Sequence, residues 1–126
     1  MKYFVSNTYR KKITDVCESS EKTMPGVKYM ALGNGAEGED GNSIELTGSE
    51  TALRNESLRK EIEIVSRDGD LRLAYSYNVK IDELVDCKIN EVAVYDETGD
   101  LVAMKVFESR RKKPGMEMTF QMTVAN

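Results

Sequence analysis

The side chains in this sequence that could do chemistry are mostly carboxylates, and several of them gather in one glycine-rich stretch. The stretch opens with Gly33-Asn34-Gly35 and continues with four oxygen-bearing residues, Glu37, Glu39, Asp40 and Asn42. Oxygen ligands at alternating positions suit a calcium ion, but this spacing does not match the loop of an EF-hand. We therefore interpret the stretch from residue 33 to residue 48 as a solvated acidic loop whose glycines prevent regular structure.

Two further patterns approach known sites without completing them. Gly33-Asn34-Gly35 follows an apolar stretch, but no third glycine completes a dinucleotide-binding fingerprint, and no Gly-Lys-Ser or Gly-Lys-Thr supplies a phosphate loop. Glu61 and Glu63 are spaced as paired hydrolytic carboxylates would be on one strand. Alternating charge is, however, also the ordinary state of a strand's solvent face, and we favour that interpretation.

Histidine is absent from the sequence, which removes the commonest general base and the commonest metal ligand. The two cysteines, Cys17 and Cys87, lack the Cys-x-x-Cys spacing of a thiolate zinc site. Both fall on segments that read as core-facing, so we expect two buried thiols rather than a disulfide. We expect no catalytic residue, no cofactor and no metal, and a protein that is not an enzyme.

The composition predicts one acidic domain. The chain has 126 residues, of which 40% are hydrophobic and 32% charged, with a net charge of −4. This length and apolar content suffice for a single domain over residues 1–126 with its own core. The charge argues against a nucleic-acid binder or a membrane binder, and no apolar stretch is long enough for a signal peptide or a membrane span. We expect a protein made in the cytosol.

One basic run departs from this acidic balance. Arg110, Arg111, Lys112 and Lys113 precede Pro114-Gly115. Four charges next to a turn usually keep a loop soluble. The alternative is contact with an acidic surface of a partner protein, which we favour over contact with nucleic acid.

The elements that must position these residues begin with a helix. Apolar side chains recur at the spacing of one helical face from Asn7 to about Lys22, at positions 9, 13, 16 and 17. Pro25-Gly26 ends the helix, and residues 27–32 read as a well-buried strand. Residues 49–59 have the propensity of a short helix opened by Ser49.

The remainder reads as strands joined by hairpins. Residues 62–64 and 71–81 alternate apolar and polar side chains around the turn 67–70, which predicts a long hairpin with one buried face. Residues 89–95 and 101–107 flank a second turn, with a bulge expected near Asn90-Glu91. Residues 116–124 form a last alternating strand. We predict a mainly β fold, an antiparallel β-sandwich of six or seven strands with one N-terminal helix packed at an edge or end.

Three segments, in this order, resemble the phage tail-collar fibre domain found at the N-terminus of phage tail-fibre proteins. The first is the strand 27–32 followed by Gly33 and Gly35. The second follows a Leu-x-Asn-Glu-x-x-Arg signature at Leu53, Asn55, Glu56 and Arg59. The third is the hairpin with Glu91, Asp96, Gly99 and Leu101, in which Ala93 stands where the family has glycine.

The resemblance implies a structural component of a phage or phage-tail-like particle, assembled in the bacterial cytoplasm with other tail, baseplate or collar proteins, and a homo-oligomer of three or more copies. Because no fibre shaft follows Asn126, we expect an adaptor rather than a receptor-binding fibre. A carbohydrate-binding module and a head or neck decoration protein are the alternatives, and the lack of tryptophan argues against the former. Among the matched residues we expect Glu56 and Arg59 to pair and fix the loop onto the sheet, with Asn55 bonding backbone groups.

Overall fold

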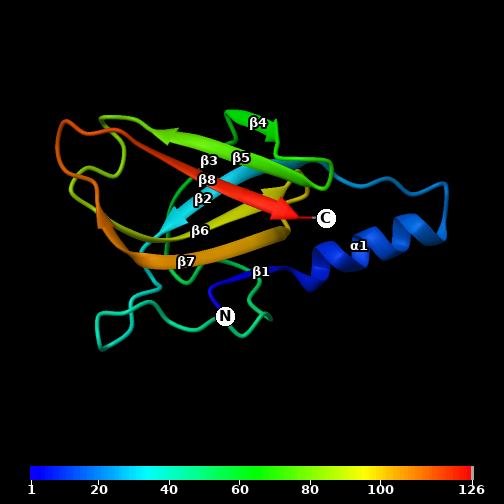
Figure 1. Cartoon of the computed structure of the whole chain (residues 1–126), viewed down its shortest axis with the longest axis horizontal. Coiled ribbons are helices and arrows are strands. Elements are labelled where there is room, and N and C mark those ends of the chain that lie inside the picture. The colour runs from blue at the N-terminus through cyan, green and yellow to red at the C-terminus, as the bar shows by residue number, and fades with distance from the viewer. Residues whose placement is uncertain (126) are drawn as a thin grey trace.

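The computed structural model describes residues 1–125 as two antiparallel β-sheets and one helix (Figure 1). The helix is α1 (Asn7–Glu18), and the strands are β1 (Tyr3–Val5), β2 (Val27–Gly33), β3 (Glu56–Glu61), β4 (Ile64–Arg67), β5 (Arg72–Val79), β6 (Lys88–Asp96), β7 (Leu101–Arg111) and β8 (Met118–Ala125). The larger sheet has the order β1-β7-β6-β2-β3, and the smaller has the order β4-β5-β8. The predicted mainly β, antiparallel class is confirmed, with eight strands among the described residues rather than six or seven.

The hairpin of β6 and β7 forms the centre of the larger sheet. Its register pairs Val92 with Lys105 and Val94 with Ala103, and it shifts between Ile89 and Glu91. The predicted hairpin and the predicted bulge near Asn90-Glu91 are therefore both confirmed. Gly99, at φ +93°, closes the turn in the left-handed region that favours glycine.

The main core lies between the two sheets, where alternate side chains of β5, β6 and β8 meet. Tyr75, Tyr77 and Val79 of β5 are buried, as the period-two pattern predicts. On β4, by contrast, Ile64 and Val65 are 61% and 55% exposed. The predicted buried face is thus correct for Tyr75, Tyr77 and Val79. It is wrong for β4 and for Leu71 and Ile81 beside β5, which are 67% and 55% exposed, because these positions lie outside the core between the sheets.

A second core covers the outer face of the larger sheet. The segment between β2 and β3 folds back over that face and buries Ala36, Leu46 and Leu53 against Ala93 and Tyr95. Strand β6 is consequently buried on both faces along almost its whole length. The segment expected to be a solvated loop is thus in part a packed cover, and its carboxylate-rich tip is exposed.

The predicted helix over residues 49–59 is wrong. Residues 56–61 instead form β3, which pairs antiparallel with β2 through Met30–Lys60 and Leu32–Leu58. The backbone N–H and C=O groups along the edge of β2 form hydrogen bonds with this segment. Those tertiary contacts override a weak helical propensity.

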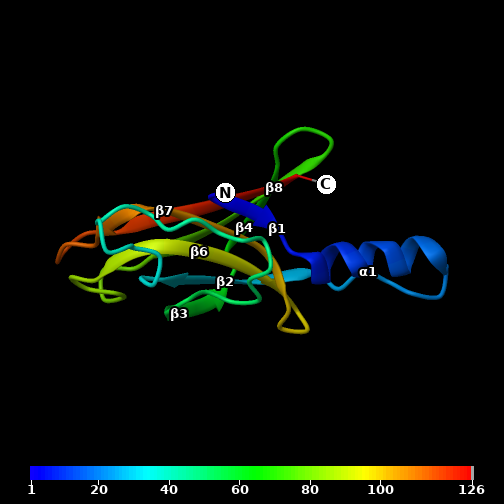
Figure 2. The same ribbon diagram turned by 90° about the horizontal axis from the view of Figure 1, so that it is seen from below.

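Helix α1 extends beyond the end of the sandwich in both views (Figures 1 and 2). Ser6 caps it by accepting the Tyr9 backbone N–H at 3.1 Å, and it ends at Glu18 rather than near Lys22. It contains no buried residue, and only Tyr9 packs in part against the main core. Cys17 is exposed and Cys87 partly exposed, both as free thiols, so the expectation of two buried thiols is wrong. Over residues 1–125, no helix is long and apolar enough to span a membrane.

Candidate functional site

Glu91 of β6 is the centre of a polar cluster. This cluster connects the larger sheet to the segment that follows β2 and to the segment that precedes β3. Its side chain is fully buried and accepts backbone N–H groups from Gly35 at 2.8 Å, Arg54 at 2.9 Å and Asn55 at 2.9 Å. Hydrogen bonds from backbone N–H to a carboxylate are stronger than neutral ones. One side chain of β6 thereby fastens two loops that are about twenty residues apart in sequence.

Asn90, next to Glu91, fastens the same loop. Its Oδ1 accepts the Ala36 N–H at 2.9 Å, and its Nδ2 donates to the Asn34 carbonyl oxygen at 3.3 Å. Neighbouring residues of a regular strand point to opposite faces, but the bulge between Ile89 and Glu91 interrupts that alternation. Asn90 was not singled out in the sequence, although the predicted bulge was the signal that could have found it.

Gly33 and Gly35 are needed where these segments touch. A Cβ on Gly33 would meet the Asn55 carbonyl oxygen and lie 2.6 Å from Glu91 Oε2, and a Cβ on Gly35 would lie 2.7 Å from the Asn55 nitrogen. Both distances are shorter than any side chain tolerates. The two glycines thus serve close backbone approach rather than the flexible turn expected from the sequence.

Glu56 and Arg59 of β3 pair as expected. Arg59 Nη2 lies 2.7 Å from Glu56 Oε1, and the guanidinium sits 3.9 Å from the centre of the Tyr95 ring. In a regular strand, side chains three positions apart point to opposite faces. The register shift opposite Leu32 and Gly33 interrupts this alternation, so Glu56 and Arg59 lie on the same face of β3. Through Tyr95, whose hydroxyl accepts the Leu53 N–H at 3.3 Å, the pair joins the cover to β6.

Asn55 differs from the expectation. Its side-chain Nδ2 donates to Asn34 Oδ1 at 2.5 Å, a contact between side chains. Its backbone makes the contacts to the rest of the cluster, because its N–H donates to Glu91 and its carbonyl oxygen accepts the Asn34 N–H at 3.1 Å. We call the cluster of Gly33, Gly35, Asn55 and Glu91 the Glu91 latch.

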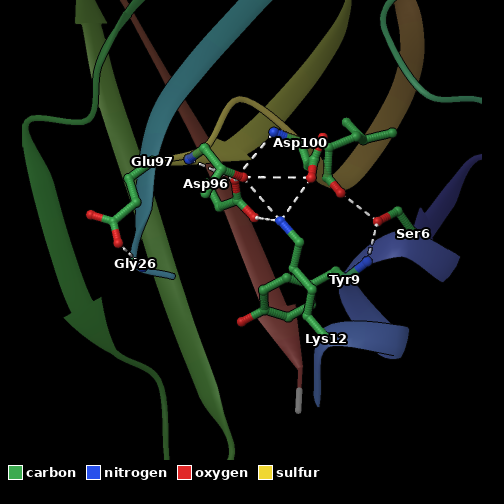
Figure 3. A network of polar contacts seen from close by, with 9 residues as sticks. Ser6, Tyr9, Lys12, Gly26, Asp96, Glu97 and Asp100 are labelled. Atoms are coloured by element: carbon green, nitrogen blue, oxygen red, sulfur yellow. Dashed lines mark hydrogen bonds and ion pairs between the residues drawn. The ribbon is translucent and has the colours of Figure 1, made fainter. Parts of the chain in front are cut away.

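Asp96, at the C-terminal end of β6, belongs to a second cluster (Figure 3), and Gly99 lies in the turn that follows. The Asp96 side chain is buried and accepts the N–H groups of Thr98 at 3.0 Å and Asp100 at 3.1 Å. Lys12 of α1 reaches it, with Nζ 2.7 Å from Asp96 Oδ2 and 2.8 Å from Asp100 Oδ2. This cluster ties the helix to the turn between β6 and β7.

The charge state of Asp96 follows from these contacts. Burial acts to raise the pKa of its carboxyl, but the hydrogen bonds from Lys12 and Thr98 outweigh burial and hold the pKa below the ordinary value of 3.8. The hydrogen bonds from Lys12 and the backbone occupy both oxygens of Asp96. This carboxylate therefore has a structural role and is not open to a substrate. Across residues 1–125, no three His, Cys, Asp or Glu side chains gather as a metal site would require.

The basic run does not form one exposed patch. Arg111 bonds Asp86, with Nη1 2.7 Å from its carbonyl oxygen, and Lys112 is fully buried, donating to the Ile81 carbonyl oxygen at 3.1 Å. The expectation of four solvated charges is therefore wrong for Lys112. Lys113 is exposed in the turn, and Arg110 lies 5.3 Å from the centre of the Phe107 ring.

Comparison with known proteins agrees with the resemblance read from the three segments. The family model described as phage tail-collar fibre protein, N-terminal, matches residues 4–125. No curated protein matches this chain.

Proposed function

The chain belongs to the phage tail-collar fibre family, and from this premise we propose that it is an adaptor that joins other proteins of a phage tail at the collar, baseplate or fibre-attachment point. The family places the chain among structural components of phage tails. The finer role proposed here treats residues 1–126 as one module without enzymatic activity, built into the virion during assembly in the bacterial cytoplasm.

The observation that carries the proposal, beside the family, is a helix with no core of its own. Helix α1 projects from the sandwich with no buried residue, and Ile13 is 37% exposed on the same face as Tyr9 and Val16. A helix of twelve residues is marginal without tertiary packing. An apolar face in that position gains stability from a partner surface.

We further propose that the partner surface includes other copies of this chain, in a trimer or larger ring. Fibre-like attachment in a symmetric particle favours a closed oligomer, and several weak contacts made together give lasting attachment. The Tyr9, Ile13 and Val16 face has the four-and-three spacing with which helices pack against one another.

The test is size-exclusion chromatography with light scattering on the purified chain, alone and mixed with the tail proteins encoded beside it. We expect a trimer or larger species, or co-elution with a tail component, and we expect Ile13→Lys to abolish it. Thr14→Lys adds the same charge on another side of the helix and serves as the matched control. A wild-type chain that remains monomeric and co-elutes with none of these proteins would overturn the proposal.

A further inference from the structure

The two sheets leave an open seam between β7 and β8. Strand β1 covers β7 only at Ala103, Met104 and Lys105, and β8 has a strand neighbour, β5, on one side only. The later part of β7 and the outer edge of β8 therefore both carry backbone groups without a strand partner. A hollow of about 100 Å³ opens there, and we name it the β7–β8 seam; it is lined by Lys105, Phe107, Arg110, Thr119, Phe120 and Gln121.

Two cations of this seam have no acidic partner. Neither Lys105 nor Arg110 forms an ion pair with any carboxylate within residues 1–125, although the chain has more acidic than basic residues. Lys105 Nζ has only the neutral carbonyl oxygen of Gln121, at 3.4 Å. Burial, and then the charge of Arg110, lower the pKa of Lys105.

Two aromatic side chains form part of the walls around these cations. Phe107 and Phe120 lie with ring centres 5.9 Å apart, and the Arg110 guanidinium rests over the Phe107 ring. Charges attract one another more strongly beside such low-dielectric walls than in water. The seam therefore presents two positive charges beside two phenylalanine rings.

The size of the hollow limits what it can hold. At about 100 Å³ it is well below the ~300 Å³ of a typical small-molecule pocket. A volume of this size suits one side chain better than a nucleotide. The open backbone edge of β8 beside it suits an extended chain that brings such a side chain.

We propose that the β7–β8 seam binds an aspartate or glutamate side chain carried by an extended segment of another tail protein, which adds to the edge of β8. This deepens the proposed function, since it rests on the chain being attached to a tail component, and it names the chemistry of the attachment. Of the basic run singled out in the sequence, it assigns partner contact to Arg110, and it adds Lys105, which lies outside that run.

The test uses two blocked peptides, acetyl-Thr-Val-Glu-Val-Thr-amide and the same peptide with glutamine in place of glutamate, titrated into isotope-labelled protein and followed by NMR. We expect the glutamate peptide to shift the signals of Phe107, Arg110, Thr119 and Gln121 saturably. We expect binding of the glutamine peptide to be about tenfold weaker, because its amide cannot form the charge-assisted hydrogen bonds.

Matched variants locate the effect. Lys105→Gln with Arg110→Gln should remove the preference for glutamate, whereas Arg67→Gln with Arg72→Gln, two exposed cations of the β4–β5 hairpin, should retain it. Equal binding of the two peptides, or no shift at the seam with either, would overturn the proposal. So would an equal response of these residues to inorganic phosphate, which would indicate a site for free anions.

A co-elution experiment separates this inference from the proposed function. If wild type co-elutes with a tail protein and the Lys105→Gln, Arg110→Gln variant does so equally well, the seam is not the attachment site, although the adaptor role stands. If wild type co-elutes with none of the tail proteins, the adaptor role itself fails.

Discussion

Gly33 and Gly35 have ordinary backbone angles, and it is the space around them that requires glycine. Neither is among the glycines with positive φ, yet the position of a Cβ on each is occupied by backbone of Arg54 or Asn55. Because Gly33 and Gly35 have no side chains, the Asn34 N–H can reach the Asn55 carbonyl oxygen, at 3.1 Å. Glu91 then gathers the N–H groups on both sides of this contact.

At this scale we predict that Gly33→Ala lowers the free energy of unfolding by about 1–3 kcal/mol, because the added methyl group displaces backbone rather than a flexible side chain. Gly26→Ala is the matched control, since a Cβ there meets nothing within 4 Å, and it should change stability by less than about 0.5 kcal/mol. Urea unfolding followed by circular dichroism measures both. Equal midpoints for the two variants would contradict the Glu91 latch as described.

At the scale of elements, α1 is held to the sandwich mainly at its first turns. The Ser6 hydroxyl donates to the Leu101 carbonyl oxygen as well as capping the helix, and Lys12 reaches the turn after β6. The helix extends past the end of the two sheets (Figure 2). The attachment therefore depends on Ser6 and on one buried carboxylate, Asp96.

We predict that Asp96→Asn lowers the free energy of unfolding by about 1–3 kcal/mol at pH 7, the range for a lost charge-assisted hydrogen bond. The folded-state pKa of Asp96 lies below 3.8, so its ionisation contributes stability above that pH and loses the contribution as the pH falls through the lower, folded-state value. The difference between wild type and variant should accordingly be constant near neutrality and shrink as the pH falls below 3.8. Urea unfolding of both proteins from pH 7 to pH 2 measures it, and a difference that grows on acidification would show that the assigned sign is wrong.

The edge strands show how the elements limit unwanted pairing. Strand β3 carries Glu56, Arg59, Lys60 and Glu61 along the edge of the larger sheet, as charged edges usually do. Strand β4 is only four residues long. The seam beside β8 differs from both, since a hollow lies along that edge with two cations that pair with no carboxylate of residues 1–125.

At the scale of the whole molecule, β6 is the common element of the two cores. It lies between β7 and β2, contributes Val92 and Val94 to the core between the sheets, and contributes Ala93 and Tyr95 to the core beneath the cover. It carries Glu91 and, at its C-terminal end, Asp96, so both polar clusters depend on this strand. Its loss would disconnect both layers and the helix.

Hydrogen exchange should reflect this arrangement. We predict that amides of Ile89–Tyr95 exchange only through global unfolding, whereas those of α1 exchange through local opening and therefore faster by orders of magnitude. Mass spectrometry of pepsin fragments measures the difference at low protein concentration, where any self-association is weakest. Protection of α1 that equals that of β6 in the monomer would contradict the description of the helix as unpacked.

The local order of apolar and polar residues determined those strands whose side chains alternate between a buried and an exposed face. It also determined the turns between them. Residues 72–79 and the hairpin around Gly99 follow from a period of two and from a turn that needs positive φ, both of which depend on neighbours a few positions away. The strand over residues 89–95 was also predicted, but nothing local indicated that a second cover buries its other face. The three family segments were readable for the same reason, since each is a short continuous motif.

Only the tertiary structure decided the features that depend on contacts between distant segments. Residues 56–61 became a strand because β2 offered an open edge, Lys112 became buried because residues 80–87 close over it, and Cys17 remained exposed because no sheet lies beneath α1. The Glu91 latch joins residues 36 to 56 positions apart, and the β7–β8 seam exists only where two sheets diverge. Such contacts depend on the free energy of the whole packed chain, which cannot be read from any short segment of the sequence.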